Sequence, residues 1–322
     1  MSKNFWQILK KKKEPILALA PMAGFTDSAF RQICSKLGAD VLYSEMVSAT
    51  ALYYNQKLKN NATLDLLKFD RQKEKYYVVQ LFGSDPEHFA VATKIITEYI
   101  KPDGIDINFG CPVPKVIKQG AGSGLMKNLA QSRKVIEAVI ANTDLPVSIK
   151  IRAKSGEVDA LKFLKNISDL PLAALMIHGR TLNQGFSGTV DYKLVKYAQQ
   201  YFKGLILVNG GINNLNDARR ALKESAANGF GLARGVLGRP WLFKEIKYDQ
   251  EINFDQANIF KLMIVHALLV QKLKGKSGII ELRKHLPWYL VGQPGAAKLR
   301  EKIVKINTLA DLKKILKEAS PK

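Results

Sequence analysis

Eight short apolar runs, each ended by glycine, proline or a polar residue, are the feature that most restricts the fold of this chain. Several runs, such as those within residues 41–43 and 205–208, have no polar residue on either face. Continuous apolar runs of this kind are typical of parallel strands buried on both sides of a sheet. They predict eight strands, over Ile16–Met22, Val41–Glu45, Tyr77–Gly83, Gly104–Gly110, Pro146–Arg152, Ala174–Arg180, Leu205–Gly211 and Gly229–Gly235.

The segments between these runs carry helix signals. Thr26-Asp27 precedes an apolar pattern of helical period, and Ser84-Asp85-Pro86-Glu87 is a favourable helix start. Residues 128–141 and 214–226 also have apolar residues at helical spacing. Eight strand–helix alternations predict an α/β fold, a (β/α)8 TIM barrel. A doubly wound open sheet is the alternative, and the lack of a G-x-G-x-x-G motif after the first run counts against it.

The strand signal stops after Trp241, and the remaining chain has a different pattern. Residues 256–320 show apolar residues at helical spacing and hold more Lys and Arg than Asp and Glu. The sequence therefore predicts two domains. A barrel that carries the active site spans residues 1–247, and a basic, all-helical domain spans residues 248–322.

The net charge narrows the choice of partner. The 322 residues include 50 Lys and Arg against 28 Asp and Glu, which gives a formal charge of +22. So much self-repulsion brings no benefit to folding, so it indicates a polyanionic partner, with nucleic acid favoured. A Lys-rich composition inherited from the genome is the alternative.

Composition also excludes several classes of protein. Two cysteines, Cys34 and Cys111, exclude a disulfide scaffold and a four-cysteine zinc site, and four scattered histidines argue against a metal cluster. The longest apolar segment, residues 259–270, is too short and too polar to span a bilayer, and the N-terminus does not read as a signal peptide. We expect a cytoplasmic protein without metal, with a monomer as the default state.

Polar or glycine-rich groups stand at nearly all eight predicted strand ends. Barrels of this class build their active sites there, and the loops after strands seven and eight commonly hold a phosphate. The pattern suits FMN, with the phosphate at Asn209-Gly210-Gly211 and Ala233-Arg234 and the ring against Pro21-Met22-Ala23. Gln80 can hydrogen-bond the ring edge, and Lys150 can place a positive charge near N1 of the ring.

Cys111 is the clearest single candidate for chemistry. It stands between Gly110 and Pro112, on a constrained loop after the fourth predicted strand. A thiol in such a place can act as a nucleophile or a proton donor. Cys34 faces the apolar side of a predicted helix, so we interpret it as structural.

Taken together, these motifs resemble those of the tRNA-dihydrouridine synthases, the FMN enzymes that reduce uridine in tRNA. A segment of the helical tail, residues 282–290, resembles the bacterial DusB-like subgroup, and the resemblance covers residues from about 15 to 320. The matching motifs are Ala20-Pro21-Met22-Ala23-Gly24-Phe25-Thr26-Asp27, Ser44-Glu45-Met46, Val79-Gln80-Leu81-Phe82-Gly83-Ser84, Asp106-Ile107-Asn108-Phe109-Gly110-Cys111-Pro112-Val113-Pro114-Lys115-Val116, Lys150-Ile151-Arg152, Ile177-His178-Gly179-Arg180-Thr181 and Val208-Asn209-Gly210-Gly211-Ile212.

The resemblance implies a mechanism. NADPH reduces FMN, the flavin N5 then gives a hydride to uracil C6, and Cys111 protonates C5 from the opposite face. The resemblance further implies that Lys150 and His178 line the flavin site. Asn108, Lys115 and Arg180 would contact the uridine or its phosphates, and the basic tail would grip the tRNA backbone.

Two other functions stay open at this point. A flavoenzyme acting on free pyrimidine, similar to dihydroorotate dehydrogenase, shares the barrel, FMN and a thiol or hydroxyl base. The charge of +22 and the basic tail argue against it, because a small substrate needs neither. The other alternative is a non-catalytic RNA-binding barrel, against which Cys111 and Lys150 argue. The sequence does not indicate which uridine is reduced, whether ribosomal RNA is also a substrate, or whether NADPH is preferred to NADH.

Overall fold

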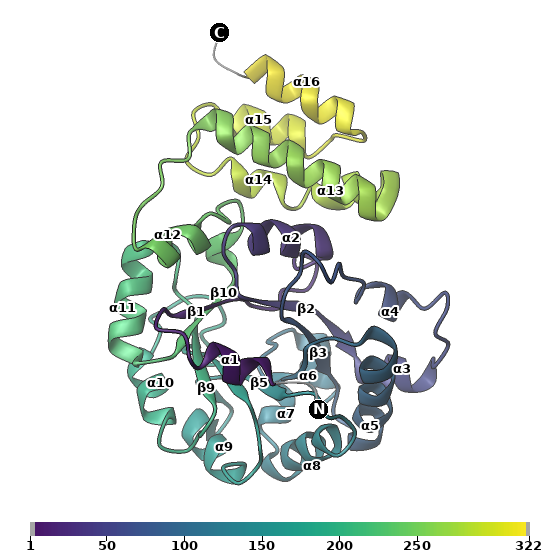
Figure 1. The fold of residues 1–322 in the computed structure, drawn as a ribbon, viewed down its shortest axis with the longest axis vertical. Coiled ribbons are helices and arrows are strands. Elements are labelled where there is room, and N and C mark those ends of the chain that lie inside the picture. The colour runs from purple at the N-terminus through teal and green to yellow at the C-terminus, as the bar shows by residue number, and fades with distance from the viewer. Residues whose placement is uncertain (1–3, 320–322) are drawn as a thin grey trace.

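The computed structural model describes residues 4–319 and shows a closed barrel of eight parallel strands surrounded by helices (Figure 1). Each strand pairs with its neighbours in chain order, and the last pairs with the first. The predicted TIM barrel is therefore confirmed. The barrel strands are β1 (Ile16–Leu19), β2 (Val41–Ser48), β3 (Tyr77–Phe82), β4 (Gly104–Asn108), β5 (Val147–Arg152), β8 (Ala174–His178), β9 (Leu205–Asn209) and β10 (Gly229–Leu232).

All eight predicted runs contain a barrel strand, but most strands end earlier than predicted. β1 stops at Leu19 and β9 at Asn209, so Pro21, Met22, Gly210 and Gly211 lie in the loops that follow. Most strand residues are buried, and positions just beyond several of the strands line the cavity at the barrel mouth. The apolar pattern thus located the strands but not their last residues.

Helices follow the strands and cover the outside of the barrel (Figure 1). Asp27 accepts a hydrogen bond from the N–H of Phe30, and Asp85 from those of Glu87 and His88, so both predicted helix starts are N-caps. The helices are α2 (Ser28–Lys36), α3 (Ala49–Tyr54), α4 (Ala62–Asp65), α5 (Pro86–Ile95) with the π-helix Ile96–Ile100, α6 (Pro114–Lys118), α7 (Ser123–Met126), α8 (Leu129–Ile140), α9 (Ala160–Asn166), α10 (Tyr192–Ala198), α11 (Leu215–Ser225), the 3-10 turn Arg234–Val236 and α12 (Leu242–Tyr248).

Several elements were not located by the sequence analysis, among them a short N-terminal helix and a hairpin after β5. The short helix α1 (Phe5–Leu9) buries Phe5 and Trp6 in one apolar cluster with strand residues such as Ile16, Val78 and Leu205. This helix therefore covers the end of the barrel away from the strand carboxyl ends. A two-stranded hairpin, β6 (Lys154–Ser155) and β7 (Val158–Asp159), follows β5. Both elements are too short to give a periodic signal.

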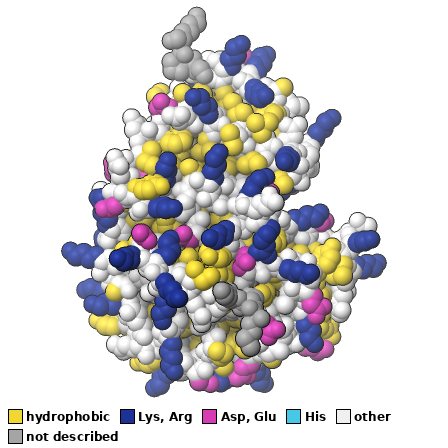
Figure 2. Space-filling view, viewed as in Figure 1, with side chains coloured by type: hydrophobic (Ala, Val, Ile, Leu, Met, Phe, Trp, Pro, Cys, Tyr) yellow, Lys and Arg dark blue, Asp and Glu magenta, His cyan; other side chains and the backbone are white. Residues whose placement is uncertain are grey.

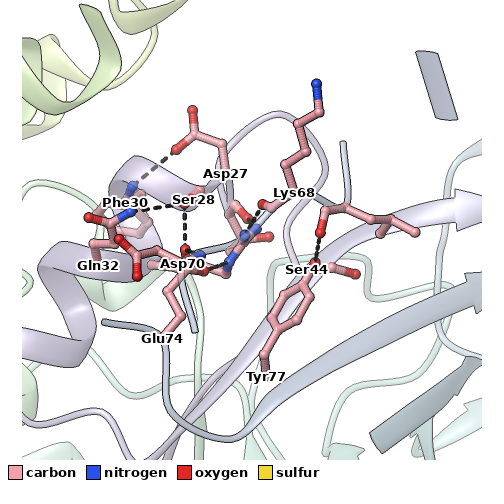
Figure 3. A network of polar contacts seen from close by, with 12 residues as sticks. Asp27, Ser28, Phe30, Gln32, Ser44, Lys68, Asp70, Glu74 and Tyr77 are labelled. Atoms are coloured by element: carbon pink, nitrogen blue, oxygen red, sulfur yellow. Dashed lines mark hydrogen bonds and ion pairs between the residues drawn. The ribbon is translucent and has the colours of Figure 1, made fainter. Parts of the chain in front are cut away.

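A buried ion pair fixes α2 to the chain segment before β3. The Arg31 guanidinium lies 2.5 Å from the Glu74 carboxylate, and both side chains are fully buried. Glu74 also accepts hydrogen bonds from Ser28 Oγ and from the N–H of Asp70 (Figure 3). Arg31 donates to the carbonyl of Lys68, so each charge is matched by several hydrogen bonds, as a buried pair requires.

The C-terminal helices stack beside α2 and α12 and have an apolar core of their own (Figure 1). They are α13 (Gln256–Leu282), α14 (Leu286–Tyr289), α15 (Ala296–Ile303) and α16 (Leu309–Ala319). Gly275, with φ 67° and ψ −152°, bends α13 seven residues before its end. The predicted helical tail is confirmed, while the division at residues 247 and 248 stays a prediction.

Candidate active site

A cavity of about 570 Å³ opens at the carboxyl ends of the barrel strands. Its wall contains all but one of the residues that the sequence nominated. Those present are Pro21, Met22, Ala23, Gln80, Asn108, Cys111, Lys150, His178, Arg180, Asn209, Gly210, Gly211, Ala233 and Arg234.

Lys115 is the exception. It is exposed on α6, which packs beside Cys111 through Val116, and it is not part of the cavity wall. Its spacing after the Cys111 motif gave no information on the direction of its side chain. A contact of Lys115 with RNA therefore stays a prediction for the outer surface near the mouth.

The strand register brings the polar wall residues to one level. Asn108 pairs with Lys150 between β4 and β5, and His178 pairs with Asn209 between β8 and β9. Because adjacent parallel strands end together, residues 42 and 31 positions apart become neighbours. The barrel topology alone accounts for this convergence.

A chain of hydrogen bonds orients the amides of this wall. Ser148 donates to one oxygen of the buried Asp106 carboxylate at 2.6 Å, and Gln80 Nε2 donates to the other at 2.7 Å. Asn108 Nδ2 then donates to Gln80 Oε1 at 2.8 Å. Burial raises the pKa of Asp106 to about 6, against the lowering effect of the hydrogen bonds from Ser148 and Gln80. Asp106 fixes which end of each amide faces its neighbour.

Cys111 lies at the end of this chain. Its N–H and that of Gly110 both donate to Asn108 Oδ1, at 2.9 and 3.0 Å. Its carbonyl accepts a hydrogen bond from Ser123 Oγ at 2.7 Å. A Cβ at Gly122, where φ is 58°, would lie 2.9 Å from Cys111 Cβ, so only glycine fits behind the thiol. The loop is held rigidly, with the Cys111 side chain at the cavity.

Burial raises the pKa of the Cys111 thiol, and the opposing effects of the Val113 N–H, Lys150 and Arg152 are smaller. The free thiol is therefore protonated at neutral pH. In this state it is a proton donor rather than a thiolate nucleophile.

The wall is strongly cationic. The lining contains Lys150, Arg152, Arg180 and Arg234 and, among residues 4–319, no Asp or Glu. Burial first, and then the charge of Arg152, lowers the pKa of Lys150 to about 8. Burial and the same four cations lower the pKa of His178 to about 2, so this histidine is neutral. An excess of positive charge in a cavity wall favours an anionic ligand.

A glycine turn lies beside these cations. Gly210 and Gly211 have φ of 100° and 71°, a region that other residues rarely adopt. A Cβ at Gly210 would also lie only 2.4 Å from His178 Cδ2. Successive glycines with this backbone can present N–H groups to an anion.

Sequence reasoning had not assigned a site role to several wall residues. Arg152 donates to the carbonyls of Gly110, Thr181 and Gly185, and it therefore ties the Cys111 loop to the loop after β8. Its place at the end of β5, two positions after Lys150, could have indicated this. Phe186 and Trp288 come from a loop and a C-terminal helix, and no strand-end pattern marked them.

Within residues 4–319, no three His, Cys, Asp or Glu side chains group in a way that could hold a metal ion. No helix in the same part of the chain is both long and apolar enough to cross a membrane.

Comparison with known proteins decides the family. The model of the family described as "Dihydrouridine synthase (Dus)" matches residues 18–322. This chain belongs to the dihydrouridine synthase family. It is 30% identical over 313 residues to a probable tRNA-dihydrouridine synthase of Aquifex aeolicus, with 96% of each chain covered. It is 34% identical over 283 residues to tRNA-dihydrouridine synthase B of Shewanella oneidensis, with 85% of this chain and 86% of the relative covered.

Solved structures agree on the architecture of this dihydrouridine synthase family member. An old yellow enzyme homologue from Zymomonas mobilis superposes with a TM-score of 0.54 at 15% identity, covering 74% of this chain and 90% of the other. At that identity the likeness concerns the fold alone. The expected family and its bacterial B-type subgroup are thus confirmed, while the roles of individual site residues stay predictions.

Proposed function

We propose that this protein is a tRNA-dihydrouridine synthase that reduces the C5–C6 double bond of uridine in the tRNA D-loop. The observation that carries the proposal is the convergence of Cys111, the cation-rich wall and the glycine turn on one cavity, in a chain of this family. The net reaction consumes one NADPH and one proton and yields dihydrouridine and NADP⁺.

The wall residues fit FMN. The turn at Gly210 and Gly211 has positive φ angles and lies in the same cavity wall as Arg234, so it suits a phosphate. A side chain at Gly210 would collide with His178, so this turn requires glycine. Lys150 has no carboxylate within ion-pair distance among residues 4–319, so it is free to face an anionic ring. Gln80, oriented by Asp106, offers donor and acceptor atoms to the ring edge. When bound, FMN supplies the hydride that reduces uracil C6.

The chain itself provides the proton. The Cys111 thiol stays protonated because burial raises its pKa, and Asn108 fixes the loop that carries it. The proton passes from Sγ to uracil C5, and solvent then restores the thiol. Arg152, bonded to the Gly110 carbonyl, keeps a positive charge next to the resulting thiolate.

The charge distribution supports an RNA substrate. Lys and Arg side chains are spread over the barrel and over the C-terminal helices on the face shown in Figure 2, with fewer acidic groups between them. We assign residues 248–322 to the grip on the tRNA backbone, and Asn108, Lys115 and Arg180 to contacts with the uridine or nearby phosphates. The proposal places the enzyme in the cytoplasm, acting as a monomer.

The direct test is nucleoside mass spectrometry of unmodified tRNA after incubation with the purified protein and NADPH. We expect a uridine that gains two hydrogens, at positions that fragment mapping then locates. A yellow protein that consumes NADPH and reduces free pyrimidine but not tRNA would overturn the proposal. A salt series adds a control, because tRNA affinity should fall steeply with ionic strength if phosphates are bound.

A further inference from the structure

Trp288 is an exposed aromatic side chain at the mouth of the cavity. Its neighbours on α14, Leu286 and Tyr289, are 0% and 1% exposed and belong to the apolar core of the C-terminal helices, whereas Trp288 is 38% exposed. Among residues 4–319, it is the one wall residue that follows residue 248. The C-terminal helices therefore complete the cavity through this side chain.

The barrel fixes the position of Trp288 from the other side. Gly238 follows the 3-10 turn after β10 and has a φ of 70°. A Cβ on Gly238 would lie 2.1 Å from the carbonyl carbon and oxygen of Trp288. The backbone of Trp288 is thus clamped between the barrel loop and its own helical core. Such a clamp preorganises a contact that a flexible side chain would have to order on binding.

The indole ring has no polar or ring-stacking partner within the described part of the chain. Among residues 4–319 it stacks on no other aromatic ring and makes no hydrogen bond or cation contact. Phe186, another exposed ring of the wall, differs, because the Arg234 guanidinium lies 4.2 Å from the centre of its ring. A partly exposed tryptophan ring in the wall of the cavity presents a large apolar face to a ligand, and tryptophan is enriched at binding interfaces for this reason.

A cation close to the cavity wall points to the kind of ligand. Lys284, four residues before Trp288 in the chain, is exposed, and its ammonium group lies 6.0 Å from the ring centre of Phe25, which lines the cavity with Trp288. Lys284 forms no ion pair among the described side chains of residues 4–319. Exposed aromatic rings combined with a cation that has no ion-pair partner are the groups by which proteins hold single-stranded RNA, with the base on the ring and the phosphate on the cation.

We propose that Trp288 stacks on the nucleobase adjacent to the target uridine and that Lys284 contacts the phosphate between the two nucleotides. The inference rests on the proposed function and names the subsite next to the reacting base. A uridine that enters the cavity leaves its stacked neighbours, which costs a few kcal/mol. Stacking on Trp288 offsets that cost for one neighbour and holds the opened strand in place.

The test measures two steps separately in the FMN-loaded enzyme. Trp288→Ala should leave flavin content and the rate of flavin reduction by NADPH within about twofold of the unmodified protein. It should weaken binding of an unmodified tRNA transcript roughly 5- to 150-fold, the range expected for the loss of one base–aromatic stack. Trp288→Phe should restore most of the affinity. Tyr197→Ala, which removes a 52% exposed ring on α10 outside the cavity, is the matched control.

Modified RNA gives a second measurement that needs no variant protein. Transcripts with a single abasic site 5′ or 3′ of the target should bind the unmodified protein less tightly at one of the two positions. At that position, Trp288→Ala should add no further loss. Equal penalties in both proteins, unchanged affinity of Trp288→Ala, or loss of flavin from it would overturn the inference. Absence of dihydrouridine with the unmodified protein would instead reject the proposed function.

Discussion

The side-chain oxygen of Asn108 accepts a hydrogen bond from the backbone N–H of Cys111 at 2.9 Å. The same side chain donates to Gln80, so one amide links the loop of the thiol to the network anchored by Asp106. The position of the sulfur relative to the cavity therefore depends on the orientation of this amide. That dependence makes Asn108 a positioning residue as well as a candidate contact for uridine.

Asn108→Ala removes the acceptor for two buried N–H groups and the donor to Gln80. We expect a loss of about 1–3 kcal/mol in the free energy of unfolding and a fall in turnover of roughly 10- to 100-fold, because the Cys111 loop loses its support. Asn128 offers the matched control, since its exposed side chain also accepts a backbone N–H, that of Gln131 at 3.1 Å. Asn128→Ala should lose about 1 kcal/mol and keep its turnover. Equal turnover in the two variants would contradict the positioning role.

Cys111→Ala should keep bound flavin and lose turnover on tRNA. Loss of a general acid typically lowers a rate by about 10²- to 10⁴-fold. Because burial raises the thiol pKa above its usual 9.0, titration of this group should not limit the rate in the free enzyme below about pH 9. The control is Cys34→Ala, which removes the fully buried thiol of α2 and should affect stability alone. Dihydrouridine formation by Cys111→Ala at the unmodified rate would remove the thiol from the mechanism.

The sequence predicted the barrel because its strands are continuous apolar runs with caps such as Asp27 and Asp85 between them, both of which are local signals. It also placed Cys111, Lys150 and Gly210 at strand ends, and topology then brings strand ends together. The exact ends of the strands were missed, as at β1, since the residues after Leu19 are still apolar but lie outside the ladder.

The sequence pattern could not predict side chains whose role depends on packing against residues distant in the chain. Trp288 reaches the cavity only because Gly238, fifty positions earlier, leaves room for its backbone. Lys115 shows the same limit, since its motif is near Cys111 in sequence but its side chain is exposed on α6, outside the cavity wall. Direction of a side chain at a helix start is set by the loop before it, which sequence spacing does not encode.

The affinity of the protein for FMN should begin to fall near pH 8, where Lys150 loses its charge. Burial and Arg152 lower its pKa to about 8, so the flavin-free protein loses this charge above that pH. The dissociation constant of FMN should then rise by up to tenfold per pH unit above about 8. Lys150→Arg should shift the onset of this fall to higher pH, and Lys150→Met should bind weakly at every pH. A profile of the unmodified protein that is flat from pH 7 to 9.5 would contradict the role of this charge.

The lowered pKa of Lys150 also predicts that its positive charge destabilises the folded protein, although the same charge strengthens FMN binding. The unfolded chain binds a proton at Lys150 up to about pH 10.5 and the folded protein only up to about pH 8. The contribution of Lys150 is therefore destabilising below pH 8 and disappears as the pH rises towards 10.5. Lys150→Met should raise the melting temperature of flavin-free protein at pH 7, as expected for a residue kept for binding. Calorimetry of the two flavin-free proteins measures this directly.

Asp27 and Lys274 join the barrel to the C-terminal helices, with 2.8 Å between carboxylate and ammonium. Burial alone would raise the pKa of Asp27, but the charge of Lys274 and smaller effects outweigh it and lower the pKa to about 2. The pair contributes stability that is fully present above about pH 3.8 and lost as the pH falls towards 2. The lowered pKa corresponds to about 2 kcal/mol at neutral pH.

Lys274→Met should therefore lower the free energy of unfolding by about 2 kcal/mol or more at pH 7, because a buried carboxylate loses its partner. The pKa of Asp27 should rise, so acid unfolding should begin at a higher pH than in the unmodified protein. Lys68→Met is the matched control, since Lys68 pairs with Asp65 at 2.7 Å on the surface, with side chains 79% and 54% exposed. Such a pair contributes about 0–1 kcal/mol. Urea unfolding at pH 7, 5 and 3 separates the two variants. If the free energy of unfolding of Lys274→Met and of the unmodified protein fell equally as the pH is lowered, this ion pair would not hold the C-terminal helices to the barrel.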